Sequence, residues 1–162
     1  MVWILALSYW VHLLTTVMWL GSLALMGLVA LPAWKRQSLS DNQWLSLQKA
    51  LTPWINISMA LIWITGFIQM TQNTQYNGFL TLDSQWAWAI LVKHVAVIVM
   101  TVLTIVVQVR IYPAMERLEL LRGRDSAETQ HKVLAQQEIR LLRLNMIAAS
   151  IVLLCTAIAT AL

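Results

Sequence analysis

Three ionisable side chains lie inside stretches of the chain that are otherwise apolar. His12 falls within residues 3–31, and the adjacent pair Lys93 and His94 falls within residues 86–109. A neutral imidazole can ligate a metal or relay a proton, and a lysine inside a membrane span can pair with an anionic group. These three residues are therefore the candidates for cofactor or metal chemistry.

The spacing predicts that the two histidines share one level. If the stretches are helices one and three of a bundle, they run in the same direction, and each histidine lies ~12–14 Å from the start of its helix. Ser8, Thr15 and Trp19 recur on the helix face that carries His12. Polar groups are left unsatisfied in lipid, so we expect this face to point into the bundle.

Axial ligation of a b-type haem by His12 and His94 is the hypothesis that this geometry favours, with Trp19 lining the same site. Lys93 would then pair with a haem propionate or another anionic group, or extend toward the membrane surface. Copper is the alternative metal, because imidazole and the thioether of residues such as Met100 both suit it. A proton relay and simple hydrogen bonding between helices are the remaining interpretations of the histidines.

Composition determines the class of protein. The chain has 162 residues, of which 59% are hydrophobic and 11% charged, too apolar for an ordinary water-soluble surface. About 20 apolar residues in a helix span a bilayer, and four stretches meet that requirement. We predict an all-α, single-domain integral membrane four-helix bundle over residues 1–162, with helices at about 3–31, 53–71, 86–110 and 126–162.

The positive charges predict the orientation in the membrane. Of the eleven Lys and Arg residues, three lie between the first two predicted helices and seven lie from Arg110 to Arg143. The positive-inside rule therefore predicts cytoplasmic basic loops and N and C termini on the outer side. This placement argues against a nucleic-acid site, and we expect the lipid bilayer to be the main partner.

A weak repeat indicates two duplicated helix pairs, with chance similarity as the alternative. Pro32-Ala33-Trp34 ends the first predicted helix and Pro113-Ala114-Met115 ends the third, with His12 and His94 at nearly equal distances before them.

Asp125 followed by Glu128 predicts that the last helix begins before the membrane. The single cysteine, Cys155, excludes a disulfide framework and is expected to be a small packing residue.

The segment from Trp10 to Gly21, in which Trp19-Leu20-Gly21 begins seven residues after His12, resembles the first helix of the CopD-type (copper resistance D) membrane domain. Lys93 within the third helix, and Arg110 and Pro113 at its end, resemble that family as well. The resemblance implies a copper role in a bacterial inner membrane. The related HemJ-type protoporphyrinogen oxidases are similar in helix one, and that likeness implies His12 as a haem ligand and Lys93 as a functional residue.

The HemJ-type family places further His and Tyr residues after helix one, where this chain reads Leu31-Pro32-Ala33-Trp34, so CopD is the closer resemblance. We predict a CopD-like protein that binds b-type haem for membrane electron transfer. Copper binding or transport, a HemJ-like oxidase, and a structural subunit of a larger membrane complex are the alternatives. Enzymatic activity and the redox partner stay open, but nothing in the sequence suggests hydrolytic or phosphoryl-transfer chemistry.

Overall fold

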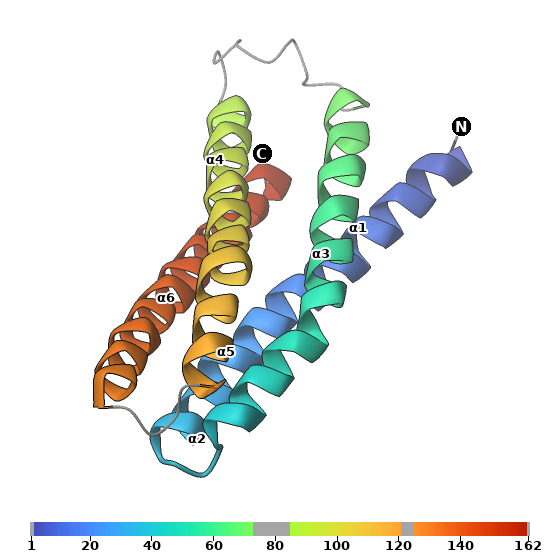
Figure 1. Cartoon of the computed structure of the whole chain (residues 1–162). Helices are drawn as coiled ribbons and strands as arrows, with labels where there is room; N and C mark the ends of the chain where they lie inside the picture. Colours follow the sequence, from blue (N-terminus) through green and yellow to red (C-terminus); the bar gives the residue numbers. More distant parts are fainter. Residues whose placement is uncertain (1, 73–84, 121–124, 162) are drawn as a thin grey trace.

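A computed structural model of the chain describes residues 2–72, 85–120 and 125–161. Throughout these residues the regular structure is helical, and four of the rods are long and apolar enough to cross a membrane (Figure 1). The predicted all-α membrane bundle is confirmed. Asn77-Gly78, a dipeptide typical of turns, lies outside the described residues.

The bundle consists of two helix pairs. Helix α1 (Val2–Ala24) continues through the π-helical turn η1 (Leu25–Ala30) into α2 (Leu31–Lys35), and its partner is α3 (Asp41–Thr71). Helix α4 (Gln85–Val106) continues through η2 (Val107–Ile111) into α5 (Tyr112–Leu120), and its partner is α6 (Asp125–Ala161). The closest packing is of α1 on α3 and of α4 on α6.

The two pairs share a local irregularity that matches the sequence repeat. Each first helix contains a π-helical turn with a proline two residues after its end, Pro32 after η1 and Pro113 after η2. A proline lacks the amide hydrogen that an α-helix needs and crowds the preceding turn, and a π turn is one way for a helix to absorb such a disturbance. The third predicted helix therefore does not end at Arg110 but continues through Pro113 to Leu120.

Helix α3 begins at Asp41, well before the start predicted at residue 53. Ser40 accepts a hydrogen bond from the backbone amide of Gln43, whose side chain accepts one from the amide of Ser40, and this capping box fixes the start. Pro53 lies inside the helix. The hydropathy pattern marks only the apolar part of α3, whereas the helix also includes a polar segment before it.

Large apolar side chains cover the outside of the rods, as expected for a protein surrounded by lipid. Of the tryptophans near the ends of the apolar stretches, Trp3, Trp54 and Trp88 are exposed. Trp86 is buried instead, and the Trp34 ring stacks on Trp44 at a centroid distance of 4.8 Å. Indoles near the end of a span can pack inward as well as anchor in headgroups.

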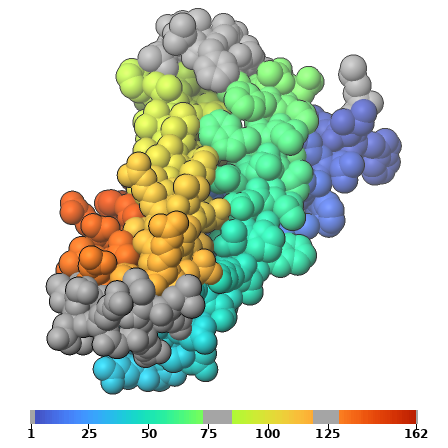
Figure 2. Space-filling view, viewed as in Figure 1, coloured from blue at the N-terminus to red at the C-terminus, as the bar shows by residue number. Residues whose placement is uncertain are grey.

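The two pairs close around one apolar core. Side chains of α3 and α4 meet in the space-filling view (Figure 2), and Trp63 Nε1 of α3 donates a hydrogen bond of 3.3 Å to Thr101 Oγ1 of α4. All four long helices contribute buried residues to this core, among them Trp19, Ile62, Val97, Met100, Ala149 and Val152. A second core lies where η1 and α2 meet α3, formed by Met26, Ala30, Leu31 and Trp44. We call that end, which also holds Lys35 and Arg36, the basic end.

Candidate functional site

His12 is half-buried between α1 and α3, and its imidazole is held by one hydrogen bond. Nδ1 lies 2.8 Å from the Thr65 hydroxyl oxygen of α3, and that hydroxyl donates its own proton to the Leu61 carbonyl at 2.6 Å. Since the hydroxyl proton is already engaged, Thr65 must accept and His12 Nδ1 must donate. The neutral ring therefore keeps its lone pair on Nε2, the arrangement in which a histidine ligates a metal.

Gly66 of α3 lies beside the His12 ring. A Cβ built on Gly66 would lie 3.6 Å from Cε1 of His12, so the ring already lies at van der Waals distance from the helix backbone. Gln69 Nε2 donates to the Ser8 carbonyl at 3.2 Å one turn away and ties the same two helices together. The ring is thus oriented by Thr65 and seated by Gly66.

Helices α4 and α6 bring two further chemical groups to this level. The charge of Lys93 acts on the His12 imidazole and also interacts with the Cys155 sulfur. Lys93 is half-buried, and Cys155 is buried. Each of the four long helices therefore contributes one polar side chain, His12, Thr65, Lys93 and Cys155, to a layer that we call the polar layer.

His94 stands beside the polar layer on α4. Its Nδ1 donates to the Ile90 carbonyl of its own helix at 2.7 Å, so this imidazole also keeps its lone pair on Nε2. Lys93 shares the buried stripe of α4 with Ala89, Ala96 and Met100, whereas His94 lies about 100° around the helix. The structure thus brings the charge of Lys93 to His12, and a cofactor held jointly by His12 and His94 stays a prediction.

The predicted inward face of the first helix is confirmed. Ser8, Thr15 and Trp19 are all buried, and they flank His12 at helical spacing. Trp19 lies in the apolar core two turns from His12, and among the described residues its indole Nε1 has no hydrogen-bond partner. Its predicted role in lining a cofactor site stays untested.

The donor set of the polar layer limits the metal chemistry it could support. Within residues 2–72, 85–120 and 125–161, no three His, Cys, Asp or Glu side chains gather as they would in a closed metal cage. A metal ion in this layer would be ligated by an imidazole and a thiol from different helices, which are few and soft donors. Such a set suits a copper ion better than a cation that needs oxygen ligands.

The sequence did not mark two members of this layer. Thr65 is the polar residue in the apolar run from Ala60 to Phe67, and a hydroxyl in such a run is a weak signal for an interhelical contact. Cys155 was assigned to packing, and its burial agrees with that, but its proximity to Lys93 gives it a chemical setting as well.

Comparison with known proteins adds the family. A family model described as "Copper resistance protein D", CopD, matches residues 47–159, more than two thirds of the chain. The chain belongs to the CopD family. The match extends from α3 into α6 and includes Thr65, Lys93 and Cys155, while His12 lies before it. Comparison with curated proteins and with solved structures gave no match.

Membership in CopD and the four apolar helices together identify a multi-pass membrane protein related to copper resistance. Within this CopD chain, the matched segment holds the α3, α4 and α6 components of the polar layer, and α1 supplies the imidazole on which the Lys93 charge acts. The bilayer is thus the environment in which the layer must function.

Proposed function

We propose that this CopD chain handles copper in the membrane, with His12 as a ligand of the transported or bound ion and Cys155 as its partner ligand. The observation that carries the proposal is the hydrogen bond from His12 Nδ1 to Thr65, which keeps the lone pair of the ring on Nε2. Imidazole nitrogen and thiolate sulfur are the ligands that copper prefers among protein side chains.

The charge balance of the polar layer supports a thiolate in this role. The Lys93 ammonium acts on both candidate ligands and would repel a copper ion held by a neutral imidazole alone. Binding through Cys155 adds a negative charge, because a thiol loses its proton when it ligates a metal. Binding of Cu(I) should therefore release one proton, so that the net charge of the polar layer does not rise beside Lys93.

The orientation follows from the positive-inside rule. We propose that the basic end faces the cytoplasm, so that the polar layer, at the opposite end of the bundle, lies in the outer half of a bacterial inner membrane. Copper would then meet His12 from the outer side before it reaches the apolar core around Met100.

Copper titration of the purified full chain in mild detergent tests the proposal. We expect near-stoichiometric copper in the wild type, at least a tenfold weaker affinity in His12→Ala, and a comparable loss in Cys155→Ser. His131→Ala is the matched control, since it removes an imidazole that contacts Asp41 and lies outside the polar layer. Equal copper affinity in His12→Ala and the wild type would contradict the proposal.

Haem binding is the second candidate, and the tautomers of the two histidines favour it. His12 and His94 each hold their Nδ1 proton in a hydrogen bond, so in both rings the lone pair is on Nε2, the nitrogen that would ligate a haem iron. Bound b-type haem would supply one-electron transfer to a membrane redox partner. A Soret band in protein from haem-replete cells, lost in His94→Ala, supports this candidate, and a colourless preparation that binds copper rejects it.

The two remaining alternatives have their own tests. A HemJ-like oxidase should rescue a strain that cannot oxidise protoporphyrinogen, and the rescue should require His12. A structural subunit should co-purify with a larger membrane complex and keep that association in His94→Gln.

A further inference from the structure

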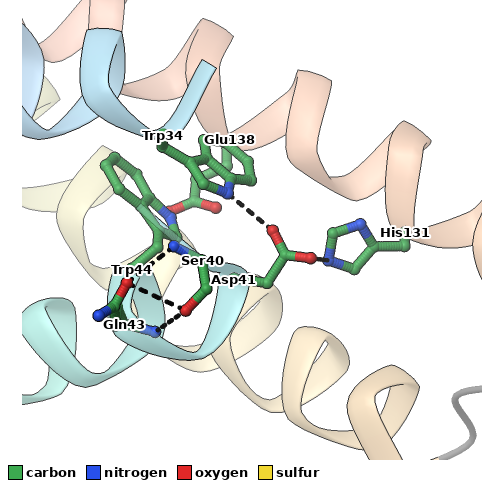
Figure 3. A network of polar contacts seen from close by, with 7 residues as sticks. All are labelled: Trp34, Ser40, Asp41, Gln43, Trp44, His131 and Glu138. Carbon is green, nitrogen blue, oxygen red and sulfur yellow. Dashed lines mark hydrogen bonds and ion pairs between the residues drawn. The ribbon is translucent and has the colours of Figure 1, made fainter. Parts of the chain in front are cut away.

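Helix α6 buries a carboxylate near the basic end of the bundle, far along the helix from the polar layer. Glu138 is only 2% exposed. Trp44 Nε1 of α3 donates a hydrogen bond of 3.1 Å to Oε1 of Glu138 (Figure 3), and Gln48 Nε2 of the same helix donates to the same oxygen. The carboxylate therefore receives both of these bonds on one oxygen.

The second oxygen of Glu138 is unpartnered. Oε2 is buried, and the described residues offer it no hydrogen-bond partner. The side chains that act on the carboxyl group are uncharged: Trp44 and Gln48 from α3, and the Tyr112 hydroxyl from the start of α5. Lys49 pairs with Glu116 and His131 pairs with Asp41, and neither ion pair includes Glu138.

An ionised carboxylate in this setting has lost its hydration without gaining a positive partner. Neutral donors on one oxygen compensate only part of that loss, and a buried acid of this kind is stabilised by taking up a cation. The smallest cation that fits an oxygen already enclosed by protein is a proton. We propose that Glu138 is a reversible proton-binding site, loaded from the basic end of the bundle.

The surroundings provide groups that could carry the proton. Tyr112 hydrogen-bonds to the Thr52 side chain, and hydroxyl groups both donate and accept, as a relay requires. On the other side, His131 lies 3.8 Å from Asp41, and Asp41 accepts from the indole of Trp34 at 2.7 Å (Figure 3). Trp34 stacks on Trp44. An indole N–H donates a hydrogen bond but cannot accept one. The contacts from His131 through Asp41 and Trp34 therefore hold Trp44 in position and do not carry a proton.

This site is independent of the copper ligands, since it shares no residue with the polar layer. A protonated carboxyl group has a C=O stretching band that a carboxylate lacks, so infrared difference spectra of the reconstituted full chain report on Glu138 directly. In the wild type we expect a carboxyl band that disappears as the pH is raised and shifts in heavy water. Glu138→Gln should lose this band while keeping an acceptor for Trp44 and Gln48.

Two controls keep the experiment decisive. Glu116→Gln changes an exposed acid and should leave the band in place. Trp44→Phe keeps the buried acid but removes a donor to its oxygen, so the band should move to higher frequency, a shift that a different carboxyl group would not show. A band unchanged in Glu138→Gln, or one that responds to sodium or potassium and not to pH, would overturn the proposal. So would a wild type without any such band.

Discussion

The hydrogen bond between Thr65 and His12 gives the most direct test of how the polar layer positions its ligand. Thr65→Val keeps the shape of the side chain and removes the acceptor that holds His12 Nδ1 at 2.8 Å. A neutral hydrogen bond contributes about 0.5–1.5 kcal/mol, and the upper part of that range applies where water is scarce. At about 1.4 kcal/mol for each factor of ten, the copper affinity should weaken roughly two- to twelvefold.

The same substitution should also affect orientation. Residues that hold a metal-ligating histidine commonly change metal affinity by roughly 10- to 100-fold when they are replaced, because the ring loses its fixed direction and tautomer. We therefore expect the copper affinity to fall about tenfold, a value that both the hydrogen-bond range and the range for histidine-orienting residues include. The assay is competition with a copper chelator of known affinity, carried out on purified protein at fixed pH.

Three variants make the outcome interpretable. Thr65→Ser restores an acceptor and should recover most of the affinity. Thr71→Val makes the same chemical change at an exposed hydroxyl that bonds only to its own helix, and Gly66→Ala adds a methyl group at an ordinary contact distance of 3.6 Å from His12. Both should stay within about twofold of the wild type. If Thr65→Val binds copper as tightly as these controls, Thr65 does not orient a copper ligand.

Two further predictions concern stability, measured by denaturant unfolding in mixed micelles. Trp44→Ala removes a ring that is 2% exposed and should lower the free energy of unfolding by about 3–5 kcal/mol, whereas Trp54→Ala, at a site 55% exposed, should cost far less. Equal losses would mean that the core at the basic end is not tightly packed. Ser40→Ala removes the acceptor for the Gln43 amide and should cost about 1 kcal/mol, and the exposed control Ser150→Ala should change little. A neutral Ser40→Ala would show that this capping box does not stabilise α3.

Periodicity predicted the inward face of the first helix because lipid imposes a strict rule on polar groups. Ser8, Thr15 and Trp19 share a face with His12, and all three are buried. In a bilayer, a polar side chain that pointed outward would find no hydrogen-bond partner, so a single stripe is enough to orient the helix. Thr104 of α4 follows the same rule, since it is buried and accepts a hydrogen bond from Asn145.

The ends of the helices were harder to predict, because hydropathy identifies only the apolar part of a helix that crosses the membrane and not its full length. The third rod continues past Arg110, and α3 starts at Asp41, since hydrogen bonding in a helix does not stop where the apolar residues stop. A capping box such as that of Ser40 and Gln43 is visible in the sequence, but Pro53 further along suggested a later start. A π turn before Pro113, which depends on local geometry, allowed the helix to pass through a residue that ordinarily ends one.

The partners of His12 could not be derived from any single helix. A stripe of polar residues fixes which way one helix faces, but the residue it meets depends on how the helices cross and on their relative rotation. Lys93 and His94 are adjacent in sequence and differ by about 100° around α4, so a modest rotation of that helix decides which of them faces the α1 imidazole. In this structure α4 directs its buried stripe, and with it Lys93, toward the interior, where its charge reaches both His12 and Cys155. The chemistry of the polar layer is therefore determined by the packing of α4 on α6.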